Sequence, residues 1–166
     1  MGLEERAKQF AVKKHAEINH VRKYTKEPYI NHPAAVVELV RSVPHTEAML
    51  AAAWLHDTVE DTETTLTDIK DNFGEEVCAL VEMLTDVSKP EDGNRVVRKA
   101  MDREHTAKAM PPAKTIKLAD LIDNSHSIIK HDPAFAKVYL NEKALLLEVL
   151  TEGDETLLRK AGQMLD

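Results

Sequence analysis

The sequence is poor in glycine, aromatic residues and cysteine. Five of its 166 residues are glycine and 4% are aromatic, whereas alanine, leucine, glutamate and lysine are plentiful. The plentiful residues are good helix formers, while strands favour β-branched and aromatic side chains. The composition therefore predicts helices rather than strands. The single cysteine, Cys78, cannot form an internal disulfide, which fits a reducing compartment and a packed thiol.

The sequence also lacks a long apolar run and an excess of positive charge. No apolar run approaches the ~18 residues of a membrane span, and the charged residues 1–6 do not have the apolar segment of a signal peptide. The net charge of −7 argues against non-specific nucleic-acid binding, which needs clustered lysine and arginine. We therefore expect a cytoplasmic protein that binds neither membranes nor nucleic acids. The oligomeric state is left open.

The apolar periodicity predicts an all-α fold, a compact helical bundle. At this length the chain can bury a substantial core, so we predict a single domain over residues 1–166. Prolines at positions 28 and 33 hold residues 21–33 out of regular helix, and residues 88–94 form the clearest loop. Helical spacing and capping signals predict helices over residues 3–20, 33–40, 46–56, 65–74, 77–84, 94–109, 113–130, 134–150 and 154–164.

The closest grouping of titratable side chains begins with His56 and Asp57, which directly follow the apolar run 49–55. Glu60 and Asp61 come within one more turn, and if the helix continues, Glu60 shares a face with His56. Imidazole and carboxylate groups can bind a metal ion, and a further carboxylate can accept a proton from water. The alternative is a solvated acidic loop or a helix cap. The buried apolar segment in front of His56 favours a hydrolytic metal centre.

Three other segments carry candidate ligands or contacts. Asp120 and Asn124 are four residues apart in one predicted helix, so they share a face. A carboxylate among apolar residues is costly to bury unless it is paired or bound to metal, although an exposed Asp120 fits equally well. His32 stands at a predicted helix start, where a structural role is the alternative to ligation. Arg22 and Lys23 either supply positive charge near a phosphate or form a solvated basic turn.

Together and in this order, these segments resemble the hydrolase domain of the RelA/SpoT family. The resemblance extends from His15 to about Asp132, and the length is similar to that of the stand-alone small alarmone hydrolases. It implies an HD-type helical fold. The segments that carry it are Arg22-Lys23, Pro28-Tyr-Ile-Asn-His32-Pro, His56-Asp-Thr-Val-Glu-Asp-Thr62, Phe73-Gly74, and Lys117-Leu-Ala-Asp120 with Asn124.

The resemblance also implies a reaction and a set of residue roles. The family removes the 3′-pyrophosphate of ppGpp or pppGpp, giving GDP or GTP and pyrophosphate, and binds one Mn²⁺ ion. Zn²⁺ or Fe²⁺ could use the same donors, so ligand chemistry alone does not choose the metal. By motif match, the metal ligands are His32, His56, Asp57 and Asp120, the acids that position and deprotonate water are Glu60 and Asp61, and the nucleotide contacts are Arg22, Lys23 and Asn124.

The sequence departs from the family pattern in two places. Lys26 replaces the glycine commonly found before Pro-Tyr, and Ser125-His126-Ser127 replaces Met-Arg-Thr after Asn124. The second change removes an arginine near the nucleotide, and His126 replaces that cation only when it is protonated. The identity of the substrate's nucleobase and of the phosphate ester that is cleaved therefore stays open. Further candidates for a phosphate pocket, which could equally face solvent, are Arg98, Arg103, His126 and Ser127.

Two other functions remain as alternatives. One is an HD-type phosphohydrolase acting on an adenine alarmone, NADPH or a phosphomonoester. The other is a non-catalytic nucleotide-binding module that has kept the fold. The presence of Glu60 and Asp61 beside a full ligand set argues against the second, because a binding module does not need acids that activate water.

Overall fold

The structure is a computed structural model that describes residues 1–165. It confirms the all-α prediction: the described residues form helices and connecting loops, with an isolated bridge between Val21 and Pro28 as their only strand-like pairing. Contacts divide the chain into two compact units, residues 1–85 and 86–166. Within residues 1–165, no helix is both long and apolar enough to cross a bilayer.

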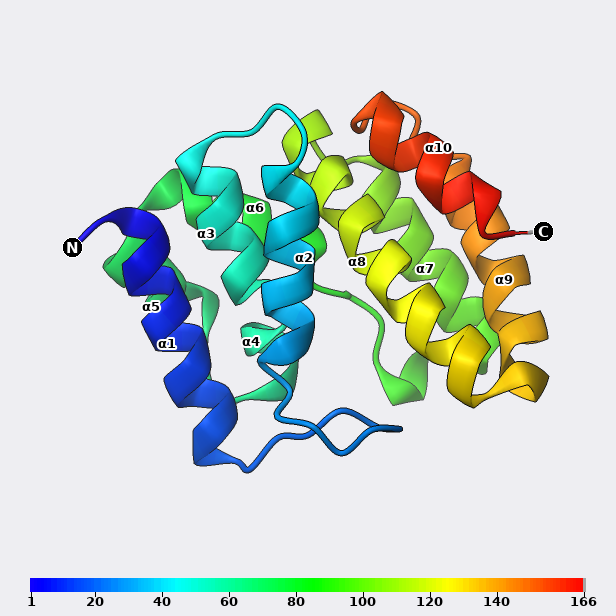
Figure 1. The fold of residues 1–166 in the computed structure, drawn as a ribbon, viewed down its shortest axis with the longest axis horizontal. Helices are drawn as coiled ribbons and strands as arrows, with labels where there is room; N and C mark the ends of the chain where they lie inside the picture. The colour runs from blue at the N-terminus through cyan, green and yellow to red at the C-terminus, as the bar shows by residue number, and fades with distance from the viewer. Residues whose placement is uncertain (166) are drawn as a thin grey trace. The chain divides into compact units, whose positions relative to one another are not determined.

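The first unit is built around α3, which packs against α1, α2 and α6. Residues 48–55 of α3 are all buried, so this helix has almost no solvent face. Figure 1 shows α3 flanked by α1 and α2. The helices of this unit are α1 (Leu3–Glu17), α2 (Asn31–Arg41), α3 (Glu47–Leu55), α4 (Thr58–Asp61), α5 (Leu66–Phe73) and α6 (Glu75–Leu84).

Local capping explains where several of these helices begin. The Thr65 hydroxyl accepts a hydrogen bond from the Asp68 amide, and the Asp68 carboxylate accepts one from the Thr65 amide. This reciprocal pair is the capping box that the sequence predicts, with aspartate in place of the usual glutamate. The hydroxyl of Thr46 caps α3 in a similar way by accepting from the Met49 amide.

The first helix ends at Glu17, three residues before the predicted end. Asn19 adopts a left-handed conformation with φ of 49°, which asparagine tolerates better than most residues. The amides of Asn19 and His20 donate to the carbonyls of Ala16 and His15, respectively. These two bonds form a Schellman motif that closes the helix and turns the chain away from its axis.

The connector between α1 and α2 folds back on itself. Its two sides meet at the Val21–Pro28 bridge, and the Arg22 amide donates to the Glu27 carbonyl over 2.8 Å. Lys26 lies in the turn with φ of 63°, in the left-handed region that favours glycine. Lys26 therefore occupies a glycine-type backbone position with a side chain that is disfavoured there.

Glycine at position 26 is expected to stabilise the protein by about 0.5–1 kcal/mol, because it relieves the left-handed strain but adds freedom to the unfolded chain. Urea unfolding of Lys26→Gly against the parent protein measures the difference. Lys13→Gly, at an exposed position inside α1, is the matched control and should lose about 1 kcal/mol. A loss of stability in Lys26→Gly would contradict the assigned backbone conformation.

The second unit is organised by α8, which packs against α9 and α10. The turn before α10 approaches α8 closely at Gly153, where a Cβ atom would lie 2.7 Å from Cδ1 of Leu118. Any larger residue there would force the Leu118 side chain to shift. The helices are the 3₁₀ helix η1 (Pro90–Asp92), α7 (Arg95–Ala107), α8 (Pro111–His131), α9 (Pro133–Leu147) and α10 (Glu155–Gln163) (Figure 1).

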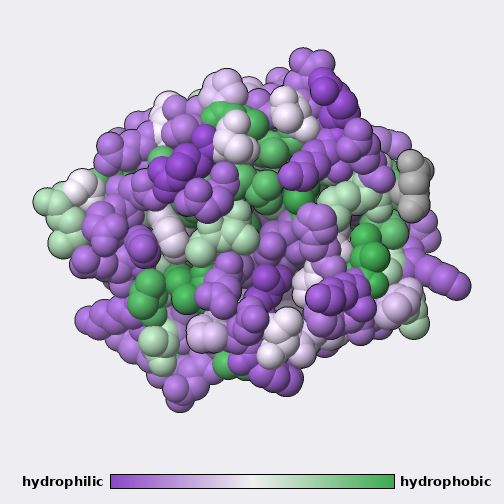
Figure 2. All heavy atoms as spheres, viewed as in Figure 1, coloured by the Kyte–Doolittle hydropathy of each residue, from purple (hydrophilic) through white to green (hydrophobic). Residues whose placement is uncertain are grey.

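The surface is predominantly hydrophilic. Figure 2 shows charged and polar residues over most of the visible face, with hydrophobic residues exposed in small separate patches. Scattered apolar residues of this kind are ordinary on the surface of a folded protein. The amphipathic pattern of the sequence is thus used mainly to bury one face of each helix.

Candidate metal centre

Three predicted metal ligands come together at helix ends in the first unit. His32 is the second residue of α2, His56 follows the last residue of α3, and Asp57 immediately precedes α4. Because α3 ends at Leu55, the chain does not run as one helix through His56 to Glu60. His56 and Asp57 lie in the turn between α3 and α4.

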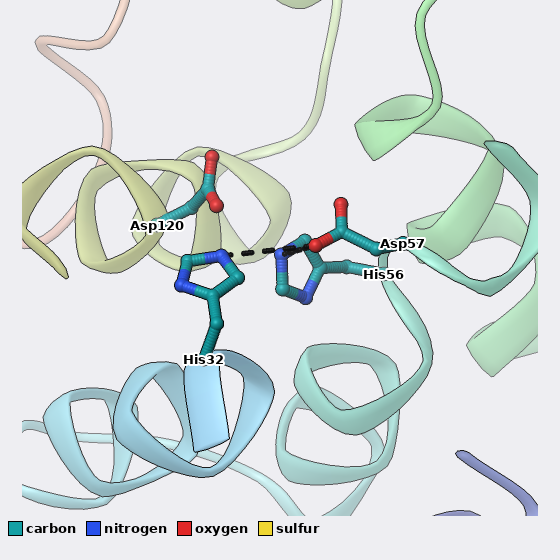
Figure 3. A group of neighbouring side chains, drawn as sticks. All are labelled: His32, His56, Asp57 and Asp120. Atoms are coloured by element: carbon teal, nitrogen blue, oxygen red, sulfur yellow. Dashed lines mark ion pairs between the residues drawn. The ribbon is translucent and has the colours of Figure 1, made fainter. Parts of the chain in front are cut away.

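The three side chains point toward one another (Figure 3). Oδ2 of Asp57 lies 3.1 Å from Nε2 of His56 and 3.7 Å from Nε2 of His32. The imidazoles are almost fully buried, with exposures of 1% for His32 and 3% for His56. Donors that share one ion through bonds of about 2.0–2.2 Å must lie within roughly twice that distance of one another. The separations of the three residues fit a single divalent metal ion.

The backbone fixes which nitrogen of His56 is available to a metal. Nδ1 of His56 lies 2.7 Å from the carbonyl oxygen of Ala53. A carbonyl can only accept, so Nδ1 carries the proton and donates it, which leaves the lone pair on Nε2. Nε2 is the atom that faces Asp57. Such an outer hydrogen bond orients a metal-binding histidine and selects its tautomer before the metal arrives.

Tyr29 contacts the same Asp57 oxygen that faces the two histidines, and this contact was not predicted from the sequence. The Tyr29 hydroxyl donates to Oδ2 of Asp57 over 2.5 Å. Its ring stacks on that of His20, with centroids 3.8 Å apart and an interplanar angle of 13°. Nδ1 of His20 in turn lies 3.1 Å from Nδ1 of His15, and burial lowers the pKa of His15 to about 4. At neutral pH His15 is therefore uncharged, and one of the two facing Nδ1 atoms donates while the other accepts.

The predicted water-activating acids lie on the short helix that follows Asp57. Glu60 and Asp61 are both exposed and belong to α4. The Asp61 amide donates to the Asp57 carbonyl over 3.0 Å, so one helical turn links the two acids to Asp57. They are therefore solvent-accessible carboxylates next to a buried cluster. Their role in handling water stays a prediction.

The predicted nucleotide contacts of the first unit lie in the connector before α2. Arg22 is half-buried, and Lys23 is exposed with its ammonium 5.4 Å from the centre of the Tyr24 ring. The connector turn holds the two residues next to the segment that carries Tyr29 and His32. Contact between this basic pair and a nucleotide stays a prediction.

In the second unit, Asp120 and Asn124 share one face of α8 as expected. Nδ2 of Asn124 donates to Oδ1 of Asp120 over 3.2 Å, and Nζ of Lys117 lies 3.3 Å from Oδ2. Asp120 is 7% exposed, so the exposed alternative does not hold. Figure 3 labels Asp120 together with His32, His56 and Asp57. Its part in the metal centre stays a prediction.

The weaker phosphate-pocket candidates divide by position. Arg103 lines a pocket in the second unit, whereas Arg98 is not among the residues that line it. His126 is exposed and Ser127 is half-buried. Of these four candidates, only Arg103 lines that pocket.

Comparison with known proteins gives consistent matches. The family model described as "HD domain" matches residues 7–146 and so extends across both units. The Xenopus tropicalis protein named guanosine-3′,5′-bis(diphosphate) 3′-pyrophosphohydrolase MESH1 is 37% identical over 130 residues, which cover 76% of this chain and 70% of that protein. The Aquifex aeolicus guanosine-3′,5′-bis(diphosphate) 3′-pyrophosphohydrolase is 36% identical over 126 residues, which cover 72% of this chain.

A solved structure is also similar over nearly the whole chain. It is described as a metazoan ortholog of SpoT that hydrolyzes ppGpp, and it aligns with a TM-score of 0.86 and 30% sequence identity over 99% of this chain and 94% of that one. The lengths of the relatives differ widely. This chain's match spans 17% of the Aquifex aeolicus protein and 16% of a Synechocystis relative, which are much longer.

Proposed function

This chain belongs to the HD domain family, and we propose that it is a metal-dependent hydrolase that removes the 3′-pyrophosphate of guanosine alarmones. The main support is the buried cluster of His32, His56 and Asp57, because a solvated acidic loop would not bury two imidazoles around one carboxylate. The relatives named for this activity, at 36–38% identity, supply the substrate class.

We assign Asp120 as the fourth ligand, on the strength of the Lys-Leu-Ala-Asp motif and its burial. Two imidazoles and two carboxylates suit Mn²⁺, and Zn²⁺ or Fe²⁺ could use the same donors. A bound ion of this kind lowers the pKa of a coordinated water and offsets charge on phosphoryl oxygens. His56 donates to the Ala53 carbonyl, and Asp57 accepts from the Tyr29 hydroxyl. These two hydrogen bonds orient the side chains for binding the ion.

The remaining roles follow from position and charge. Glu60 and Asp61 orient the attacking water and accept its proton, as exposed carboxylates one turn from Asp57 can do. Arg22, Lys23 and Asn124 contact the nucleotide. The reaction consumes one water and releases pyrophosphate, which converts ppGpp to GDP and pppGpp to GTP.

Removal of metal is expected to abolish turnover. Dialysis against EDTA should eliminate pyrophosphate release from ppGpp, and titration with Mn²⁺ should restore it better than Zn²⁺, Fe²⁺ or Mg²⁺. The physical reason is that no side chain of the site can lower the pKa of water as far as a coordinated ion does. Activity that survives chelation would contradict a metal-dependent mechanism, and full restoration by Mg²⁺ alone would contradict the assignment of Mn²⁺.

A substrate panel separates the proposed activity from its alternatives. Mn²⁺-loaded protein is incubated with ppGpp, pppGpp, an adenine 3′-pyrophosphate nucleotide, NADPH and a nucleoside monophosphate, and the products are identified by chromatography. Pyrophosphate together with GDP or GTP supports the proposal. Orthophosphate release from NADPH or a monophosphate would indicate a different phosphohydrolase, and binding without products would indicate a non-catalytic module.

A further inference from the structure

The second unit contains a pocket of about 150 Å³, most of whose lining residues have no role in the proposed reaction. That volume is smaller than the roughly 300–1,000 Å³ of pockets that enclose a drug-sized ligand, so it suits a group rather than a whole nucleotide. Its wall includes Asp120 and Asn124, two residues already assigned to the reaction. The other lining residues are Asp86, Lys99, Asp102, Arg103, Thr106, Lys117, Leu121, Tyr139, Glu142, Lys143 and Leu146.

Lys143 is the most unusual member of this wall. It projects from α9 and is only 1% exposed, so its ammonium group does not reach solvent as a surface lysine would. Nζ donates to the hydroxyl of the buried Ser125 over 2.8 Å. Within residues 1–165 no carboxylate lies within ion-pair distance of it, and burial lowers its pKa to about 8. A buried amine with a neutral partner is costly to keep and is rare without a function.

Two further cations, Lys99 and Arg103, line the same pocket, and the charge of Lys99 acts on the nearby Asp86. Neither Lys99 nor Arg103 forms an ion pair or a side-chain hydrogen bond with another residue in the described part of the chain. Two acids of the pocket wall, by contrast, are already engaged. Asp102 accepts from the Ser88 hydroxyl and from two backbone amides, and Glu142 forms a two-bond pair with Arg95.

The other two acids of the wall, Asp120 and Asp86, repel a bound anion less strongly than two free carboxylates would. Lys117 offsets the charge of Asp120, and the Asn124 amide donates a hydrogen bond to the same carboxylate. Burial raises the pKa of Asp86, and so favours its uncharged form more than usual. The pocket therefore presents three cationic side chains whose charge no ion pair within the described chain neutralises.

We propose that this pocket binds a phosphate group of the nucleotide substrate, with Lys143 as its central contact. The inference rests on the proposed function for the identity of the substrate, and on the pocket for the identity of the bound group. A phosphate oxygen accepts hydrogen bonds from ammonium and guanidinium groups and supplies the negative charge that Lys143 lacks. Asp120 and Asn124 belong both to the wall of this pocket and to the residues proposed for the reaction.

Lys143→Met is the sharpest test, because methionine keeps the length of the buried chain and removes the amine. With Mn²⁺-loaded protein, we expect KM for ppGpp to rise about tenfold to a hundredfold, kcat to change less, and metal content to stay the same. The thermal midpoint should hold or rise, since an uncompensated buried amine is lost. Lys137→Met, on the exposed side of the same helix, is the matched control and should behave like the parent protein.

A second measurement separates this inference from the proposed function. Binding of inorganic pyrophosphate to chelated, metal-free protein is followed by calorimetry in the parent protein and in Lys143→Met. Weaker binding in the variant supports the subsite even if the parent fails to hydrolyse ppGpp. Unchanged KM and unchanged pyrophosphate binding would overturn the subsite while leaving hydrolysis intact. If Lys143→Met does not fold, Arg103→Gln, which is half-exposed, is judged by the same two readings.

Discussion

Alanine in place of Asp57 is expected to lower pyrophosphate release by about a thousandfold or more. The Asp57 carboxylate faces Nε2 of both His32 and His56 and accepts a hydrogen bond from Tyr29. Its loss therefore removes a proposed metal ligand that contacts the other residues of the cluster. A metal ion contributes several kcal/mol of transition-state stabilisation, and each 1.36 kcal/mol corresponds to a factor of ten in rate. Steady-state turnover of ppGpp and metal content by mass spectrometry measure the two effects together.

A nearby acid provides the control for this variant. Asp71 is exposed on α5 in the same unit, and Asp71→Ala should keep parent-like turnover and metal content. Circular dichroism on both variants checks that the helices are retained. If Asp57→Ala hydrolyses ppGpp at the parent rate, the reaction does not take place at this cluster.

Glutamine in place of Glu60 is expected to lower kcat by about 10²–10⁴-fold and to leave metal content unchanged. The amide keeps the size of the side chain but cannot accept a proton from water, so only the proton-transfer role is removed. Because Glu60 is exposed on α4, glutamine there is expected to leave the fold intact. Single-turnover measurement with saturating ppGpp isolates the chemical step.

Two companion variants determine how the acidic pair divides its work. Asp61→Asn should produce a smaller loss if it orients the water and a comparable loss if it accepts the proton. Glu63→Gln, at an exposed position just beyond α4, should have no effect. Loss of metal in Glu60→Gln would make Glu60 a ligand instead, and full activity would remove it from the mechanism.

The sequence was most informative where structure is determined locally. Capping by Thr65 and Asp68 depends on residues three positions apart, so the start of α5 could be predicted from the pattern alone. The short helix α4 could not, because four residues contain too little apolar periodicity to be recognised. The end of α3 before His56 could not be predicted for the same reason. Because the helix does not continue through His56 and Asp57, the condition under which Glu60 would share a face with His56 is not met.

Contacts between distant segments lay beyond sequence reasoning. Tyr29 reaches Asp57 across 28 positions, and nothing in the Pro28-Tyr-Ile motif specifies that partner. Lys143 did leave a signal, since it falls on the inward stripe of α9 with Ala136, Tyr139 and Leu146. A lysine on such a stripe is ordinarily interpreted as a surface residue, and only its burial against Ser125 distinguishes it.

The enclosure of α3 also limits how freely this sequence can vary. Ala51, Ala52 and Ala53 are completely buried between neighbouring helices, and α3 ends at Leu55, directly before the proposed ligand His56. Any larger side chain at these positions would overpack the core, at a cost of about 1–3 kcal/mol, and displace the helix end. Natural variants that lose metal binding should therefore occur at these alanines as well as at the ligands, although an alanine side chain has no donor atom to offer.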